Sequence, residues 1–179
     1  MSISIIAAID ENSAIGYKGD LLFKIKKDLS NFKRLTSHNE FGLKNYLVCG
    51  RKTYLSLPFR PSDRKLVVLT RDEHFKADKD VLVAHSLENI INHYKSGEQQ
   101  KEMFLIGGQE LYKEGLKYAD KIYLTKIYAK AEKADTYFNY LEMIKEFEVI
   151  DHETHIEDGL EFAYITYERK NSKENIDGR

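Results

Sequence analysis

The sequence predicts a single α/β domain with a mostly parallel central sheet, flanking helices and an antiparallel C-terminal edge strand. Two observations lead to this prediction. Short apolar runs rich in β-branched residues alternate with segments of helical spacing over about the first two thirds of the chain, and strand-like runs dominate the last third. Strands that alternate with helices are joined by crossover connections, which place them parallel in one sheet. We expect residues 1–170 to form the domain and the polar residues 171–179 to form a frayed tail.

The expected elements follow from hydrophobic spacing. Residues 2–8 are apolar and β-branched, which predicts a buried strand, and the polar residues 10–19 predict a long mobile loop. Ile25, Leu29, Phe32 and Leu35 have the spacing of an amphipathic helix that buries these side chains. Later strands are expected over 46–49, 65–70, 81–84, 103–106, 121–129, 147–152 and 162–167, and further helices over 51–57, 87–93 and 109–116.

Composition narrows the class of partner. A chain of 179 residues that is 42% hydrophobic can bury one substantial core, so one domain is expected. The formal charge of -1 provides no basic field for nucleic acid. No apolar run approaches the roughly 20 residues that a membrane-spanning helix needs. The single cysteine, Cys49, lies in an apolar run and is expected to be a buried, inert thiol. These features favour a cytoplasmic monomer with a small-molecule partner, without a nucleic-acid or membrane partner.

Two apolar runs end in glycine and continue into segments that can open a helix. They are Val48-Cys49-Gly50-Arg51-Lys52-Thr53 and Ile106-Gly107-Gly108-Gln109. Such elbows can present backbone N–H groups to a phosphate. Two elbows in one small chain predict a dinucleotide that lies across the sheet.

One carboxylate lies on the face of a helix that should be buried. Asp28 falls between Ile25, Phe32 and Leu35 on the helical wheel. Burying an ionised carboxylate without partners costs on the order of several kcal/mol, so Asp28 needs either structural hydrogen bonds or a ligand. A flat ring with an amino group beside a ring N–H could donate two parallel hydrogen bonds to it, between apolar walls from Leu29 and Phe32. On spacing alone, a structural acid and ordinary core packing stay open.

Taken in order, the motifs resemble the dihydrofolate reductase family from Ile3 to about Lys170. The matching segments are Ile5-Ile6-Ala7-Ala8 with Ile15-Gly16, Asp28-Leu29 with Phe32-Lys33 and Leu35-Thr36, Val48 to Tyr54, Arg60-Pro61 with Arg64, Leu69-Thr70-Arg71, Ile106 to Tyr112, Tyr123-Leu124-Thr125, and Asp135-Thr136 with Phe138. The resemblance implies an enzyme of one-carbon metabolism that reduces 7,8-dihydrofolate by hydride transfer from NADPH and binds antifolate inhibitors. It implies no metal.

The resemblance also implies a role for each matched position. Asp28 would hold the pteridine and promote its protonation, Thr125 would share its hydrogen-bond network, and Phe23 would occupy the third catalytic position. Substrate would be bound by Ile6, Asp28, Leu29, Phe32, Leu57, Arg64 and Thr125, with Arg64 on the glutamate α-carboxylate; taken alone, Arg64 is an exposed loop charge. Cofactor would be bound by Ala8, Ile15, Gly16, Gly50, Arg51, Lys52, Thr53, Leu69, Thr70, Arg71, Ile106, Gly107, Gly108, Gln109, Glu110, Leu111, Tyr112 and Thr136. In this family the glycine pair carries a cis peptide, and cations near the ribose 2'-phosphate favour NADPH over NADH.

The chain departs from the family pattern in two loops. The family usually has Pro-Trp where this chain has Leu22-Phe23, and a phenyl ring cannot donate the indole hydrogen bond that helps to hold an ordered water. The segment before Arg64 also lacks the usual second proline and apolar residue. Two alternatives stay open. Asp28 and Arg64 argue against a related riboflavin-pathway reductase of a ribosylamino-pyrimidine, whereas Leu22-Phe23 leaves room for a non-catalytic folate or nucleotide binder.

Overall fold

The computed structural model describes residues 2–37, 41–58, 60–96 and 101–171. Its central sheet contains β1 (Ile3–Ile9), β4 (Tyr46–Gly50), β5 (Lys65–Leu69), β6 (Leu82–Ala84), β7 (Met103–Leu105), β8 (Lys121–Ile127), β10 (Phe147–Glu157) and β11 (Leu160–Arg169). A smaller sheet contains β2 (Ala14–Tyr17), β3 (Asp20–Leu21) and β9 (Thr136–Tyr137). The helices are α1 (Lys26–Ser37), α2 (Arg51–Ser56), α3 (Leu87–Ser96), α4 (Gln109–Gly115) and α5 (Tyr140–Glu146).

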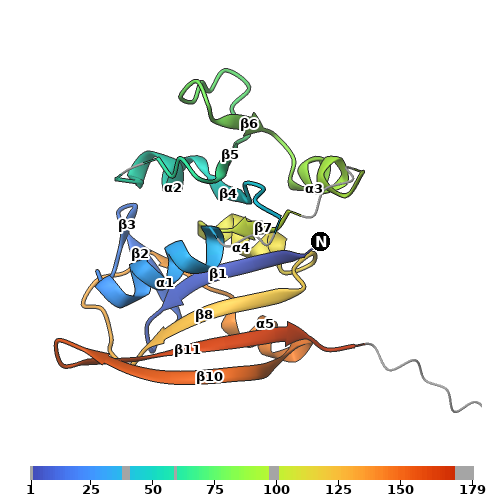
Figure 1. Ribbon diagram of the computed structural model, residues 1–179. Coiled ribbons are helices and arrows are strands. Elements are labelled where there is room, and N and C mark those ends of the chain that lie inside the picture. The colour runs from blue at the N-terminus through green and yellow to red at the C-terminus, as the bar shows by residue number, and fades with distance from the viewer. Residues whose placement is uncertain (1, 38–40, 59, 97–100, 172–179) are drawn as a thin grey trace, which may run out of the picture.

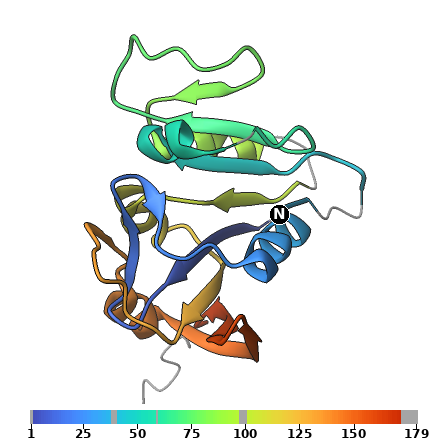
Figure 2. The same ribbon diagram turned by 90° about the vertical axis from the view of Figure 1, so that its left-hand side faces the viewer.

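The central sheet follows the order β10-β11-β8-β1-β7-β4-β5-β6 (Figure 1). Every pair from β8 to β6 is parallel, and the β10–β11 hairpin adds two antiparallel strands at one edge. Figure 2 shows this succession from β6 at the top to the hairpin at the bottom. The predicted α/β class, with its mostly parallel sheet and antiparallel C-terminal edge, is confirmed.

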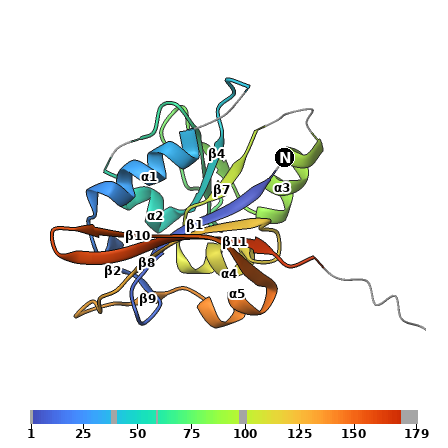
Figure 3. The same ribbon diagram turned by 60° about the horizontal axis from the view of Figure 1, so that its bottom comes forward.

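The helices cover both faces of the central sheet because its strands are apolar on both sides. Successive residues of a strand point to opposite faces, and in β1 the side chain of Ile5 packs into one apolar cluster while that of Ile6 packs into another. The Ile5 cluster takes side chains from α3, α4 and α5, and the Ile6 cluster takes them from α1 and α2. Figure 3 shows α1 and α2 on one side of the sheet and α4 and α5 on the other.

The segment 10–19, predicted to be a mobile loop, contains strand structure instead. β2 pairs with β3 and with β9, which is supplied by a distant part of the chain. Asp10 is buried, and its carboxylate accepts hydrogen bonds from the backbone N–H groups of Asn12 (2.8 Å), Ala14 (2.9 Å) and Ala131 (2.9 Å). Because Ala131 lies 121 residues away, this anchor leaves no local trace in the sequence.

The other expected elements are present with boundaries shifted by a few residues, although β10 extends further than expected, to Glu157. The helix α5 was not expected. α5 has seven residues and buries only Met143, so it shows no helical pattern long enough to detect. Cys49 is buried as predicted, and burial raises the pKa of its thiol to about 12. Of the predicted tail, residues 172–179 lie outside the described residues. Among the described residues, no helix is long and apolar enough to cross a membrane.

Candidate active site

Asp28 and Thr125 meet where α1 crosses the face of the sheet. Asp28 lies in the first turn of α1, and Thr125 Oγ1 donates a hydrogen bond of 2.5 Å to Asp28 Oδ1. In β8, Thr125 pairs with Ala8 of β1 on one side and with Tyr164 of β11 on the other. The acid is therefore held next to the middle of the sheet by a residue 97 positions away.

The surroundings of Asp28 favour its protonated form. Burial raises the pKa of the Asp28 carboxyl, the hydrogen bond from Thr125 lowers it, and the negative charge of Glu157 raises it again. The net pKa lies above the usual value for aspartate. No ion pair of Asp28 is found within the described part of the chain, so its loss of hydration is offset mainly by one hydroxyl group.

Packing brings together only some of the apolar side chains that were predicted to bind the substrate. Ile6, Phe32 and Leu57 share one apolar cluster on the α1 and α2 side of the sheet. Leu29, in contrast, is 49% exposed, so the prediction that α1 buries this side chain is wrong. Leu29 directly follows Asp28 in α1.

Arg64 is buried, so the prediction that it is an exposed loop charge is wrong. Its side chain is only 3% exposed, and Nη1 donates to Thr36 Oγ1 at 2.6 Å while Nε donates to Asp63 Oδ1 at 3.1 Å. The guanidinium carbon lies 5.8 Å from the centroid of the Phe32 ring. Arg64 thus lies beside the last turns of α1. The same helix carries Asp28 near its start.

The two glycine elbows lie side by side. β4 and β7 are neighbouring parallel strands, so they end at the same edge of the sheet. The Gly50 N–H donates to the Gly107 carbonyl at 2.7 Å, and the Gly107–Gly108 peptide is cis, as the family resemblance predicted. A Cβ on Gly50 would lie 3.6 Å from Gly108 N, and a Cβ on Gly108 would lie 3.4 Å from Thr53 Oγ1. The backbones of the two elbows therefore lie together at one edge of the sheet, which fits a dinucleotide that is bound through backbone N–H groups.

Tyr112 connects the second elbow to the central strand. Its hydroxyl donates to the Ile6 carbonyl at 2.9 Å, and its ring packs edge-on against Phe138 at 5.3 Å between centroids. Full burial raises the pKa of the Tyr112 phenol, so the group remains a neutral donor. A Cβ on Gly107 would lie 3.1 Å from this hydroxyl oxygen.

The smaller sheet contacts the same elbow. Gln109 Oε1 accepts a hydrogen bond from Tyr137 N at 2.8 Å, which ties α4 to β9. Thr136 pairs with Gly16 of β2, and a Cβ on Gly16 would lie 3.0 Å from Thr136 Oγ1. Gly16, Gln109 and Thr136 are therefore brought together, as candidate cofactor residues from three separate segments.

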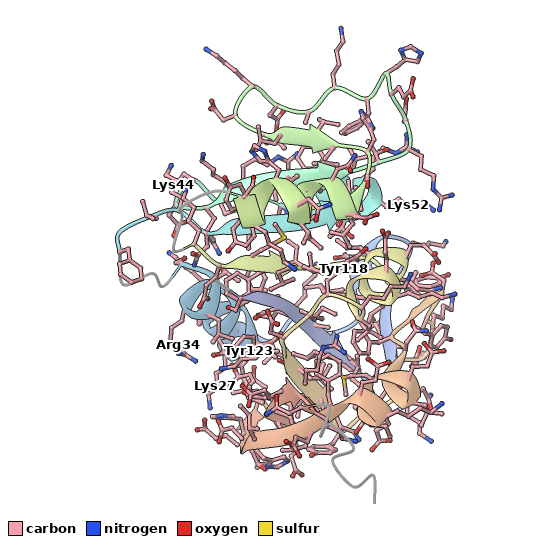
Figure 4. The ribbon with its side chains drawn as sticks, turned by 90° about the vertical axis from the view of Figure 1, so that its right-hand side faces the viewer. Lys27, Arg34, Lys44, Lys52, Tyr118 and Tyr123 are labelled. Atoms are coloured by element: carbon pink, nitrogen blue, oxygen red, sulfur yellow. The ribbon has the colours of Figure 1, made fainter. Side chains whose placement is uncertain are left out.

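The predicted phosphate-binding cations lie at the ends of β4 and β5, and one of them already has a partner. Arg51 Nη1 lies 2.9 Å from Asp72 Oδ2, whereas Lys52, labelled on α2 in Figure 4, and Arg71 are exposed. Thr70 Oγ1 accepts from Asp72 N at 3.2 Å, and the Thr70 carbonyl lies 2.8 Å from His85 Nδ1. Sequence reasoning missed Asp72 and His85; the pairing of β5 with β6 brings His85 here.

Phe23 lines a small hollow between β1, β2 and the segment that follows β3. The hollow measures about 10 Å³ and is lined by Ala8, Ile15, Leu22 and Phe23 among others. That is about the space of one water molecule. The remaining candidates occupy the elbows at different depths: Leu69 and Ile106 are partly buried, Leu111 is in the core, and Glu110 is exposed.

A third residue missed by sequence reasoning is Glu157, at the end of β10. Its carboxylate accepts hydrogen bonds from Lys26 N at 2.7 Å and Lys27 N at 3.0 Å, the first two residues of α1. The partners lie about 130 residues apart, so no local motif could have indicated this contact.

A mostly parallel sheet, paired glycine elbows and a nearby acid with few partners define the class of nucleotide-dependent reductases. The family model described as dihydrofolate reductase matches residues 2–169, and the chain belongs to that family. Its activity is the NADPH-dependent reduction of dihydrofolate. The family therefore decides against the riboflavin-pathway reductase and the non-catalytic binder.

Individual relatives agree with this assignment. The dihydrofolate reductase of Schistosoma mansoni is 35% identical over 94% of this chain and 96% of its own length. That of Bacillus subtilis is 31% identical over 95% of this chain and 96% of its own. Among solved structures, dihydrofolate reductase from Enterococcus faecalis, complexed with NADP(H) and RAB-propyl, is similar with a TM-score of 0.81 and 28% identity, covering 95% of this chain and 97% of that one.

Proposed function

We propose that Asp28 binds the pteridine ring of dihydrofolate and promotes protonation of the ring nitrogen next to the carbon that accepts hydride. The observation that carries this proposal is the 2.5 Å hydrogen bond from Thr125, which occupies Asp28 Oδ1. No hydrogen bond of Oδ2 is found among the described residues, so this oxygen is available to a ligand. A carboxylate can accept parallel hydrogen bonds from an amino group and a ring N–H.

The raised pKa of Asp28 supports its role as a source of protons. Bound NADPH supplies the hydride, and the imine nitrogen must gain a proton for that transfer to be efficient. A carboxyl whose pKa is raised stays protonated to higher pH, so it extends proton delivery toward neutral pH. The rate of reduction is therefore expected to fall as pH rises through the pKa of Asp28.

The cofactor is proposed to lie along the edge formed by the elbows Gly50–Thr53 and Gly107–Gln109. The hydrogen bond from Gly50 to Gly107, which brings the two elbows together, supports a backbone that contacts the pyrophosphate. Arg51, Lys52, Thr70 and Arg71 are proposed to surround the ribose 2'-phosphate.

The remaining proposals concern the substrate tail and the setting of the reaction. Arg64 is proposed to bind the glutamate α-carboxylate, which suits a guanidinium held in place by Thr36. The protein is proposed to act as a monomer. The lone buried Cys49 fits a reducing compartment such as the cytoplasm.

Asp28→Asn tests the proposed role of the acid. The amide keeps the shape of the side chain and can still accept the hydrogen bond from Thr125, but it cannot supply a proton. We expect turnover with dihydrofolate and NADPH to fall by about 10²- to 10⁴-fold, with NADPH affinity unchanged in a fluorescence titration. Full turnover in this variant would refute the role of Asp28.

A further inference from the structure

We propose that Glu157 is a positioning residue for Asp28: its carboxylate caps the first turn of α1 and fixes where that turn lies against the sheet. Glu157 lies at the end of β10, far from the glycine elbows in the sheet order. This inference rests on the catalytic role proposed for Asp28. It adds a residue from the C-terminal hairpin to the machinery of the reaction.

The contact replaces a cap that α1 lacks locally. The first N–H groups of a helix have no partner within the helix, and Lys24 and Ile25, which precede Lys26, have no side-chain acceptor. Glu157 Oε2 accepts from Lys26 N at 2.7 Å and Oε1 accepts from Lys27 N at 3.0 Å. A carboxylate is well suited to this position because it also complements the positive end of the helix dipole.

The start of α1 is thereby attached to the β10–β11 hairpin at several points. Besides the two backbone contacts, Lys27 Nζ donates to the Ile156 carbonyl at 3.1 Å. Figure 4 shows Lys27 at the end of α1 nearest the hairpin. Asp28 follows Lys27 directly and bonds Thr125 of β8. Three successive residues are therefore fixed to the sheet, and the position of the Asp28 carboxyl depends on all of these contacts.

The same contact acts on the charge of Asp28. The positive end of the helix dipole stabilises an ionised Asp28, whereas the negative charge of Glu157 opposes it and raises the pKa of the carboxyl. The amino group of Lys27 is directed to the hairpin backbone. Removing the charge of Glu157 should therefore lower the pKa of Asp28.

Two tyrosines interact electrostatically with Asp28, Tyr164 on β11 and Tyr112 on α4, and Arg34 on α1 and Glu153 on β10 act in turn on Tyr164. Burial raises the pKa of the Tyr164 phenol to about 12 and raises that of Tyr112 as well, so both are neutral where Asp28 titrates. Arg34 and Glu153 are unchanged in the variants below.

Glu157→Gln in the full chain tests the proposal. The amide removes the charge and can accept only one of the two backbone hydrogen bonds. Two readouts are used: the pKa of the Asp28 carboxyl from a ¹³C NMR titration, and the pH midpoint above which NADPH oxidation with dihydrofolate declines. Both are expected to move to lower pH, with kcat reduced above the midpoint and NADPH affinity unchanged. Loss of a purely structural cap would lower stability and leave both midpoints in place.

Two further variants complete the test. Glu148→Gln removes the same charge from an exposed position on β10 without touching α1, and is expected to leave both midpoints unchanged. Glu157→Asp keeps the charge. Its Asp28 pKa and its pH midpoint are expected to be closer to those of the unchanged protein than the values for Glu157→Gln are. The proposal is overturned if Glu157→Gln leaves the Asp28 pKa unchanged, or if Glu148→Gln shifts it equally. Because the NMR titration needs no turnover, it decides this even if Asp28→Asn retains full activity.

Discussion

The proposed substrate half and the proposed cofactor half of this site are built from different parts of the polypeptide. We define the proposed substrate half as Asp28, Phe32, Arg64 and Thr125, and the proposed cofactor half as the two glycine elbows with Tyr112. In the substrate half, side chains meet across long stretches of sequence, as Thr125 meets Asp28. In the cofactor half, the backbones of two adjacent parallel strands meet directly, as Gly50 meets Gly107.

This difference predicts how each half responds to substitution. A group held by side-chain hydrogen bonds can be removed without moving the backbone, so its loss should affect one part of the substrate. A glycine elbow has no side chain to lose, and at Gly107 an added Cβ would lie 3.1 Å from the Tyr112 hydroxyl oxygen, which would have to shift. Changes in the substrate half should therefore act selectively, and changes in the elbows should act on cofactor affinity and stability together.

The largest expected effect among the variants that test this comparison belongs to Arg64→Gln. Hydrogen bonds to charged groups contribute about 1.5–3 kcal/mol, so kcat/KM for dihydrofolate should fall by about 10- to 100-fold. Buried Arg64 also supports Thr36, so some stability should be lost. The matched control is a dihydropterin without the aminobenzoyl-glutamate tail, whose kcat/KM should change little. An equal loss for both substrates would contradict the assignment of Arg64 to the tail.

The same contrast explains what the sequence could predict. Glycine elbows and apolar strands are local patterns, so the parallel sheet and the paired elbows could be expected from short segments, whereas the cis peptide was expected only through the family resemblance. The position of Asp28 on a helix was also local information. Its partner Thr125 was expected only through the family resemblance, because a threonine in a strand is ordinary by pattern.

What the sequence could not predict depends on contacts between distant residues. Asp10 anchors the 10–19 segment through Ala131, and Glu157 caps α1 through Lys26. Leu29 has the spacing of a buried residue but is 49% exposed. In each case, tertiary contacts decide the outcome, and they have no signature in the local sequence.

Gly107→Ala is expected to have the next largest effect. Gly107 has a φ of +116°, and an added Cβ would lie 3.1 Å from the Tyr112 hydroxyl oxygen. Such a conformation costs about 1–3 kcal/mol for a residue with a side chain. Because Tyr112 must also shift, NADPH affinity should fall by about tenfold, or about 1.4 kcal/mol.

Gly42→Ala is the control for this substitution. Gly42 also has a positive φ, +66°, but an added Cβ there meets nothing within 4 Å. The Gly42→Ala variant should be less stable in thermal unfolding, and its NADPH affinity in a fluorescence titration should be unchanged. If both variants bind NADPH normally, the close packing at Gly107 does not shape the cofactor site.

The smallest expected effect comes from Asp72→Asn, which tests whether side chains also matter in the cofactor half. Asp72 lies 2.9 Å from Arg51, and both side chains are about 40% exposed, so the pair contributes at most about 1 kcal/mol. Releasing Arg51 should tighten NADPH binding by about two- to fivefold at low salt, with NADH binding unchanged because NADH lacks the 2'-phosphate. Asp80→Asn removes the same charge from an exposed position in the following loop and should leave both affinities as they are. Tighter binding of NADH as well would show that Asp72 acts through the general field and not through Arg51.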